Sequence, residues 1–404
     1  MKKILVASPN SFLPQFNLFT DYVIGKKLHG ENKYNVVFAT SFTKGVKVIS
    51  KYNGILTYRL PFLFFSNKII SLLLSIFMSL FLLLITRPDV IFVHHFRSNS
   101  HFLILFAKLF GIKTILGEWG ILHDEYLTDN RDNPLEEKLK IDNIIYDRIT
   151  FHHLNDTFIN KVYNYLRHWK WYNVDEIIFY SKHNFDYIGR LKIIKPDVKY
   201  MPCYLDLESV KIQDNYQDVD NKYDFIKNKK VVFLIGQLKK RKGYDIFLEV
   251  AKHISEERDD VVFILASGTN NKQEIKRIND EITNLNMNEK IKFLFKISNE
   301  ERNFLYKHTD IYLMPSRYEG FGLSAIEAGY NGALVVASDV PALNEFLEND
   351  KNALLFENGN ITDAVKKIRI AFNLTVERKQ ILIDNMSKTC ENFTIKNIQY
   401  KDFL

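Results

Sequence analysis

The feature that most constrains this chain is the alternation of short apolar runs with helical patterns along its whole length. The runs are continuous in apolar character, which is typical of strands covered on both faces, and the helical patterns between them favour parallel sheets. The first half contains KKILVAS, YNVVFAT, DVIFVHH, KTILGE, DEIIFYS and VKYMPC, and the second half KVVFLIG, DVVFILAS, KIKFLFK, DIYLMPS and ALVVAS. We therefore predict an α/β fold.

A polar stretch at residues 207–230 interrupts this rhythm, which then restarts. The 404 residues also exceed what one core holds, and a length prior of roughly 150 residues per domain gives two or three. We predict two doubly wound Rossmann-like domains, at residues 1–206 and 229–385, joined by a linker at 207–228. Ligands of such sheets bind at the carboxyl ends of the strands, so a cleft is expected between the domains. Residues 386–404 are predicted to form a terminal helix.

Two segments of the first half stand apart. Residues 124–172 form a polar and aromatic insert, predicted as two helices. Residues 69–86 carry no charge and reach the lower length limit of a membrane-spanning helix. Within them Ser71, Ser75 and Ser79 recur every four residues and form one small-residue face. Because a span here would divide the α/β fold, we favour an apolar helix of that fold, for which contact with the membrane surface is one option. Interfacial insertion and a true span are the alternatives.

The net charge and the cysteine content indicate which binding partners and which cellular compartment to expect. A net charge of +7 suits an anionic partner but, spread over so long a chain, does not indicate nucleic acid. Cys203 and Cys390 match no metal-site spacing, so we expect two free, buried thiols in a reducing cytosol. The apolar stretch at the N-terminus is too short for a secretory signal. The predicted location is the cytoplasm, or peripherally the inner face of the cell membrane.

The stretch FLIGQLKKRKGYDIFLEVA indicates a strand that ends at Gly236, a basic loop, and a helix that starts near Gly243. A polyanion approaching the strand ends and the helix N-terminus would meet the cations of this loop. A solvated loop is the alternative. The same strand-to-turn pattern recurs in ILASGT at Ser267 and Gly268, where an ordinary turn is the default interpretation. The basic loop carries Lys239, Lys240, Arg241 and Lys242.

The stretch EGFGLSAIEAG, residues 319–329, places two acids eight residues apart at a predicted helix start. Gly320 and Gly322 let backbone N–H groups approach a ligand, and the unpaired N–H groups of a helix start suit a diphosphate. Glu319 and Glu327 are carboxylates able to accept hydrogen bonds from vicinal hydroxyls of a ribose or a sugar. Taken alone, two such acids would more often be a helix cap and a solvated face.

Taken together, the basic loop and the stretch EGFGLSAIEAG resemble the motifs of the retaining glycosyltransferases with the GT-B fold, of the GT4-type group. The likeness is strongest over residues 231–360. It includes GQLKKRKG for the family's Gly-Arg…Lys-Gly loop and PSRYEGFGLSAIEA for its element of two glutamates separated by seven residues. The resemblance implies that Lys242 neutralises the donor diphosphate, that Glu319 holds hydroxyls of the donor sugar, and that Glu327 binds the nucleotide ribose. The resemblance and the loops above give this set of donor-binding residues: Gly236, Gln237, Arg241, Lys242, Ser267, Gly268, Glu319, Gly320, Phe321, Gly322, Leu323 and Glu327.

The sequence departs from the family in two places. Gln237 stands where the family has an arginine, which removes one cation from the phosphate site, and Arg241 or Lys240 is a candidate to compensate for it. The first N-terminal loop, ASPNSFLPQF, lacks the family's glycine pair and offers Asn10 and Ser11 as acceptor-loop residues instead.

The catalytic candidates are His123, Asp124 and Glu319. Family members have a cleft-facing histidine after the fourth strand, where this chain has GEWGILHDEY, and Glu118 is an alternative there. The paired histidines have no carboxylate at ligand spacing, so no metal site is expected. These pairs are His94 with His95 and His152 with His153.

The resemblance implies a metal-independent transfer of a sugar, with retention, from a nucleotide-diphosphate sugar to an acceptor hydroxyl. No cofactor is expected, since the nucleotide sugar is a substrate. The apolar segment and the basic charge favour a glycan or lipid-linked acceptor in the synthesis of surface polysaccharides or glycoconjugates. The alternatives are a GT-B nucleotide-sugar epimerase, a polymerase, or a non-catalytic nucleotide-sugar-binding or membrane scaffold protein.

Overall fold

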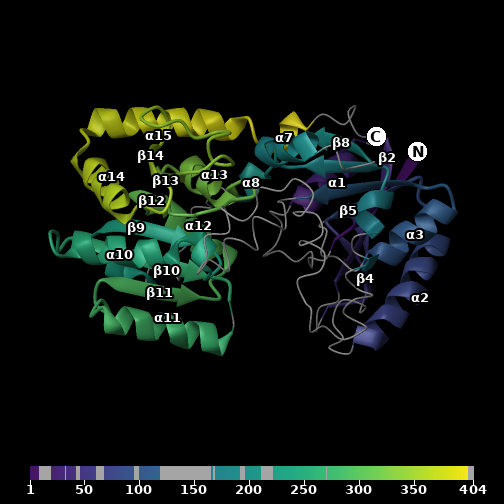
Figure 1. Cartoon of the computed structure of the whole chain (residues 1–404), viewed down its shortest axis with the longest axis horizontal. Helices are drawn as coiled ribbons and strands as arrows, with labels where there is room; N and C mark the ends of the chain where they lie inside the picture. Colours follow the sequence, from purple (N-terminus) through teal and green to yellow (C-terminus); the bar gives the residue numbers. More distant parts are fainter. Residues whose placement is uncertain are drawn as a thin grey trace. The chain divides into compact units, whose positions relative to one another are not determined.

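A computed structural model describes residues 1–8, 20–31, 33–41, 46–60, 68–94, 100–118, 165–166, 169–191, 196–210, 222–269 and 271–398. The chain forms two units (Figure 1). Of the described residues, unit 1 holds those up to Asp206 and those from Ile395 onward, and unit 2 holds Leu207–Thr394.

Unit 1 is built on an eight-stranded sheet in the order β3-β4-β2-β1-β5-β6-β7-β8. All neighbouring strands run parallel except β3 and β4. The strands are β1 (Lys2–Ala7), β2 (Tyr34–Ser41), β3 (Ile49–Tyr52), β4 (Ile55–Leu60), β5 (Val90–His94), β6 (Lys113–Glu118), β7 (Glu176–Phe179) and β8 (Asp197–Tyr200). The helices of this unit are α1 (Thr20–Gly30), α2 (Lys68–Thr86), α3 (His101–Leu109), α7 (Lys182–Leu191) and the 3-10 turn η6 (Ile395–Asn397).

Unit 2 is built on a six-stranded parallel sheet in the order β11-β10-β9-β12-β13-β14. The strands are β9 (Lys230–Ile235), β10 (Val261–Ser267), β11 (Ile291–Phe295), β12 (Ile311–Met314), β13 (Leu334–Asp339) and β14 (Leu354–Glu357). The helices are α8 (Leu207–Val210), η4 (Asp224–Ile226), η5 (Lys240–Lys242), α10 (Tyr244–Ser255), α11 (Lys272–Asn284), α12 (Asn299–Lys307), α13 (Leu323–Tyr330), α14 (Ile361–Asn373) and α15 (Val376–Glu391).

The strands of unit 2 are buried on both faces, as their continuous apolar character predicts. All seven residues of β10 are buried, and successive side chains along the strand point to opposite faces of the sheet. Val261, Phe263 and Leu265 join the core cluster formed with α10, α11 and α14. On the other face, the ring of Phe233 from β9 packs against that of Tyr306 from α12. The predicted fold class, with two doubly wound parallel sheets, is confirmed.

Three strands were not predicted. β3 and β4 form an antiparallel hairpin, whose turn residues Asn53 and Gly54 both have positive φ, 46° and 82°. Asn-Gly is the favoured pair for a two-residue turn of this kind, so the missed signal was present in KYNGIL. β14, with the sequence LLFE, lies in a stretch for which no strand was predicted.

The predicted terminal helix at 386–404 is wrong in its extent. α15 begins at Val376 and ends at Glu391, before the turn that leads to η6. The chain leaves the helix because Phe393 packs against Phe321 and Phe346, and because Ile395 N–H donates to the Leu205 carbonyl in unit 1. The insert at 124–172, predicted as two helices, lies almost wholly outside the described residues.

The apolar segment predicted at 69–86 forms helix α2, whose faces differ. Ser75 and Ser79 are buried, and α2 packs beside α3 (Figure 1). In contrast, Leu73 is 61% exposed and Phe77 67% exposed. In the described ranges, none of the helices has the length and apolar character required to cross a bilayer. The serine face therefore turns inward, and an apolar stripe of the helix is left on the surface.

Cys203 and Cys390 are free and buried, as predicted. Burial raises the pKa of the Cys390 thiol to about 12, and this thiol lies 3.4 Å from the Ile326 carbonyl oxygen to which it donates. Both cysteines serve packing.

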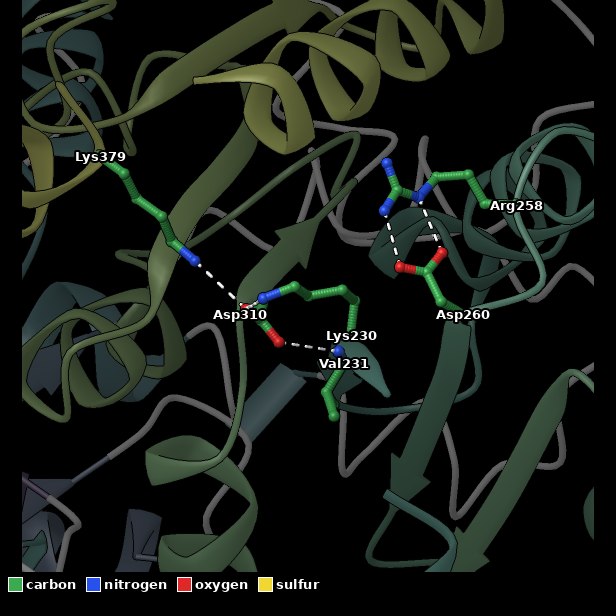
Figure 2. A network of polar contacts seen from close by, with 6 residues as sticks. All are labelled: Lys230, Val231, Arg258, Asp260, Asp310 and Lys379. Atoms are coloured by element: carbon green, nitrogen blue, oxygen red, sulfur yellow. Dashed lines mark hydrogen bonds and ion pairs between the residues drawn. The ribbon is translucent and has the colours of Figure 1, made fainter. Parts of the chain in front are cut away.

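Charged residues brace the amino end of the unit 2 sheet (Figure 2). The Asp310 carboxylate accepts from Val231 N–H at 3.1 Å and from the Lys230 and Lys379 ammonium groups at 3.0 and 3.3 Å. Beside it, the Arg258 guanidinium binds Asp260 through two hydrogen bonds. These contacts tie α15 to β9 and β12 at the edge opposite to the carboxyl ends of the strands.

Glu301 joins the segment before β9 to α12. It completes a capping box with Ser298 and also accepts hydrogen bonds from the Lys222 ammonium and the Tyr223 hydroxyl. Burial opposes ionisation of this carboxyl most strongly, but hydrogen bonds from Lys222, Ser298 and Tyr223 outweigh it and lower the pKa of Glu301.

We expect Glu301→Gln to lower the free energy of unfolding at pH 7 by about 2 kcal/mol. A lowered folded-state pKa gives stability that is present above the ordinary glutamate pKa, about 4.3, and is lost as the pH falls toward the folded-state value. Urea unfolding between pH 7 and 3 should therefore show a shallower acid loss in Glu301→Gln than in the wild type. The exposed neighbour Glu300→Gln is the control, and equal slopes in all three proteins would contradict the prediction.

Candidate active site

The basic loop lies between β9 and α10, at the carboxyl edge of the sheet. It leaves the strand at Gly236, forms the turn η5, and enters α10 at Gly243. Gly243 has φ +70°, and a Cβ there would lie 1.8 Å from the Pro315 carbonyl oxygen. Only glycine fits this position, because the loop after β12 crosses it at backbone contact distance.

The second loop, residues 315–322, connects β12 to α13. It ends at Gly322, which has φ +108° and forms the N-cap of α13. A Cβ at Gly322 would lie 2.3 Å from Leu343 Cδ2. Phe321 is buried against Phe346 and Phe393. Buried packing on both sides therefore fixes the start of α13, and Gly320 and Leu323 are the partly exposed residues of this turn.

The two loops meet in an ion pair between Lys242 and Glu319. The Lys242 ammonium lies 2.6 and 2.7 Å from the two carboxylate oxygens of Glu319, and the Ser316 hydroxyl donates to Oε1 at 2.6 Å. The Glu319 side chain is 4% exposed and that of Lys242 is 22% exposed. A carboxylate so deeply buried needs both partners, since an unpaired buried charge costs several kcal/mol. Lys242, predicted to bind the diphosphate, is therefore in direct contact with Glu319, predicted to bind the donor sugar.

Glu327 lies on α13, slightly more than one turn from the helix start at Leu323. Its Oε2 accepts a hydrogen bond from the Tyr306 hydroxyl at 2.8 Å. Burial, together with the charge of Glu327, raises the pKa of Tyr306 well above its usual value. The phenol therefore stays a neutral donor that holds this carboxylate in one orientation.

Gln237 and Arg241 are partners within the basic loop, because the Arg241 guanidinium donates to Gln237 Oε1 at 3.1 Å. Arg241 thus lies beside the position where the family has its arginine. At Gly236 and Gly268 a Cβ would meet no atom within 4 Å, so packing within the chain does not require glycine at either position. Ser267, at the end of β10, is buried and accepts from Thr269 N–H at 3.3 Å.

β10, β9 and β12 are neighbours in the sheet. Since parallel strands present their carboxyl ends at one edge, the candidates that follow these strands share that edge. They are Gly236, Gln237, Arg241, Lys242, Ser267, Gly268, Glu319, Gly320, Phe321, Gly322, Leu323 and Glu327.

Four of the predicted site residues lie outside the described residues, namely His123, Asp124, Asn10 and Ser11. Glu118, the alternative to His123, is described: it ends β6 and is buried. His94, one of the paired histidines, ends β5, and its Nδ1 lies 3.4 Å from the Tyr180 hydroxyl. Within the described part of the chain, the side chains of His, Cys, Asp and Glu form no group of three suited to a metal ion.

Four residues that contact the site or its loops were not predicted from the sequence: Ser316, Tyr306, Arg317 and Asp245. Ser316 stands three residues before Glu319 in PSRYE, where a serine is itself a signal for a local side-chain hydrogen bond. Tyr306 carries no such signal, since it lies 21 residues from its partner Glu327. Arg317 and Asp245 are 72 residues apart and pair through two hydrogen bonds.

A sequence model of the family described as glycosyl transferases group 1 matches residues 215–389, which include both loops and both acids. Residues 215–389 are therefore similar in sequence to this family. The fold of the chain is GT-B, since the structure superposes on sucrose-phosphate synthase from Thermosynechococcus elongatus with a TM-score of 0.75, 16% identity, and coverage of 98% of this chain and 96% of that one. It also superposes on Anabaena HepE in complex with UDP-glucose with a TM-score of 0.68, 14% identity, and coverage of 99% and 98%.

Two proteins of known activity are similar to this chain in sequence. The GPI3 subunit of phosphatidylinositol N-acetylglucosaminyltransferase from Saccharomyces cerevisiae is 23% identical over 90% of this chain and 74% of its own length. Mannosylfructose-phosphate synthase from Agrobacterium fabrum is 28% identical over 31% of this chain, and the match spans only 29% of that protein.

Proposed function

We propose that this glycosyltransferase moves a sugar from a nucleoside-diphosphate sugar to an acceptor hydroxyl with retention of anomeric configuration, as a GT4-type enzyme. The observation that carries the proposal is the Lys242–Glu319 pair beside the α13 N-terminus, with Glu327 oriented on the same helix. These groups supply a cation and helix dipole for a diphosphate, and two carboxylates for sugar and ribose hydroxyls.

In the proposed reaction, the bond between the anomeric carbon and the β-phosphate breaks through an oxocarbenium-like state. The acceptor oxygen attacks the anomeric carbon from the same face, and its proton passes to the departing diphosphate. Negative charge grows on that phosphate, where Lys242 and the N–H groups of the α13 start stabilise it. Glu319 holds the donor sugar, and Glu327 accepts from the ribose while Tyr306 occupies its Oε2.

We propose His123 and Asp124 as catalytic residues, and Asn10 and Ser11 as residues of the acceptor loop. We further propose that transfer needs no metal ion, because Lys242 and the backbone dipoles supply the positive charge that a divalent cation otherwise would. Turnover that persists in excess EDTA would support this, and turnover restored only by Mg²⁺ or Mn²⁺ would overturn it.

The functional experiment is a screen of UDP-, GDP- and ADP-sugars for turnover, with UDP, GDP and ADP as thermal-shift probes. We expect one nucleotide to raise the melting temperature and its sugar to be consumed, with retention visible by NMR of the anomeric proton. Epimerised donor without release of nucleotide would indicate an epimerase. A growing chain of identical sugars would indicate a polymerase, and neither turnover nor binding would indicate a scaffold.

For the acceptor we propose a glycan or lipid-linked saccharide of surface polysaccharide or glycoconjugate synthesis, reached at the inner face of the cell membrane. The support is the apolar stripe of α2, which consists of Leu73, Phe77, Phe81, Leu84 and Ile85 and is 42–67% exposed. Apolar side chains at such spacing on one helix face suit the acyl boundary of a bilayer, and the net charge of +7 suits anionic lipid.

We expect the wild-type protein to float with vesicles that contain anionic phospholipid, and Phe77→Gln/Leu84→Gln to remain largely in the pellet. The matched control is Val376→Gln/Ile381→Gln, which alters two exposed apolar residues of α15 in unit 2. Flotation should survive in this control. Equal flotation of the wild type and the α2 variant would contradict membrane contact through α2.

A further inference from the structure

The basic loop and the loop before α13 are fastened together by Arg317. Its guanidinium donates to both carboxylate oxygens of Asp245, at 2.7 and 2.8 Å, and to the Lys240 carbonyl at 2.6 Å. Asp245 lies in the first turn of α10. One side chain of the second loop thus binds both the turn η5 and the helix that follows it.

Backbone contacts complete this connection. Arg317 N–H donates to the Arg241 carbonyl at 2.7 Å, and Asn358 Nδ2 donates to the Arg317 carbonyl at 3.1 Å. The Arg317 side chain is only 20% exposed, so its two-pronged bond to Asp245 is less screened than a surface pair. The contacts lie on both sides of Lys242 in sequence, at Lys240, Arg241 and Asp245.

We propose that Arg317 is a positioning residue of the donor site, acting through a clamp formed by Arg317, Asp245 and the Lys240 carbonyl. The inference rests on the proposed function: the clamp is the group of contacts that holds Lys242 and Glu319 at a fixed separation. Because Lys242 and Glu319 stand on different loops, their separation depends on what joins those loops. The clamp sets it, and with it the distance between the diphosphate subsite at Lys242 and the sugar subsite at Glu319.

The test compares Arg317→Gln, Arg317→Lys and Asp245→Asn with wild type. The affinity for whichever of UDP, GDP or ADP binds the wild type should fall about tenfold in Arg317→Gln and Asp245→Asn. Lysine keeps the charge but not the two-pronged geometry, so Arg317→Lys should recover only part of the loss. The double variant Arg317→Gln/Asp245→Asn should lose little more nucleotide affinity than either single variant, since each substitution removes the same contact. kcat should fall together with affinity, because Lys242 and Glu319 would no longer be held in register.

Arg258→Gln is the matched control, because Arg258 makes the same two-pronged bond to Asp260 at the opposite edge of the sheet. Because the Arg258–Asp260 pair is more exposed than the Arg317–Asp245 pair, Arg258→Gln should lower the melting temperature less than Arg317→Gln and should leave nucleotide affinity unchanged. A nucleotide affinity for Arg317→Gln equal to that of Arg258→Gln or of the wild type would overturn the clamp.

Hydrogen exchange separates this proposal from the proposed function. Amides of residues 239–243 and 316–323 should exchange faster in Arg317→Gln, both segments together, and at the wild-type rate in Arg258→Gln. If the wild type binds none of the three nucleotides, the proposed function fails. The exchange rates of the two segments would still show whether Arg317 holds the two loops together. Exchange that is unchanged in both segments would overturn it.

Discussion

Lys242→Ala is expected to lower kcat/KM for the donor roughly 10²–10³-fold, the usual cost of removing one preorganised charge-stabilising group. The ammonium of Lys242 is the cation that contacts Glu319 directly, at 2.6 and 2.7 Å. Its loss would leave the departing diphosphate without that charge and the buried Glu319 carboxylate with only the Ser316 hydroxyl among these partners. Initial rates with the active nucleotide sugar measure the effect.

Lys240→Ala is the control for this loss, because Lys240 belongs to the same basic turn and its side chain is exposed. The change removes an equal charge but leaves the Lys240 carbonyl to Arg317, so kcat/KM should stay within about threefold, as expected of a screened surface charge. Equal losses in the two variants would mean that the loop acts through its net charge alone. Wild-type turnover in Lys242→Ala would remove Lys242 from the mechanism.

Gly243→Ala is expected to destabilise unit 2 by about 3 kcal/mol and to abolish nucleotide binding. Two costs combine at this position. The backbone has φ +70°, which disfavours a Cβ, and that Cβ would lie 1.8 Å from the Pro315 carbonyl oxygen. The loop after β12 would have to move away, and the contact between Lys242 and Glu319 would open. Urea unfolding and nucleotide thermal shifts measure the two effects.

Gly359→Ala carries only the first of these costs, the positive φ. Gly359 also has a positive φ, +80°, but a Cβ there would meet no atom within 4 Å. This variant should lose only about 1 kcal/mol and bind nucleotide normally. A loss in Gly243→Ala no larger than in Gly359→Ala would show that the two loops do not need their close approach.

Much of the fold was predictable because strand ends are local features. The runs KVVFLIG, DVVFILAS and DIYLMPS matched β9, β10 and β12 to within two residues at either end. The elements that were not predicted depend on turn signals or on distant contacts. The β3–β4 hairpin depended on a turn signal, Asn53-Gly54, in a segment with weak apolar character, and α15 ended at Glu391 because Phe393 had a distant aromatic cluster to join.

For helix α2, the sequence established the small-residue face but not the direction in which it turns. Ser75 and Ser79 could equally have faced solvent. Packing against α3 and the unit 1 core buries them, and this places Leu73 and Phe77 on the surface. The apolar stripe that motivates the proposed membrane contact is therefore a result of tertiary packing.

By itself the sequence determined that two sets of parallel strands would form, and that the basic loop and the glutamate pair would follow strands of the second set. Local apolar pattern and glycine chemistry suffice for that. Only the tertiary structure decided which side chains meet, because β10, β9 and β12 become neighbours through long-range pairing. That pairing joins Lys242 to Glu319 across 77 positions, and Arg317 to Asp245 across 72. No local pattern encodes such contacts, since each depends on the order of strands in the sheet.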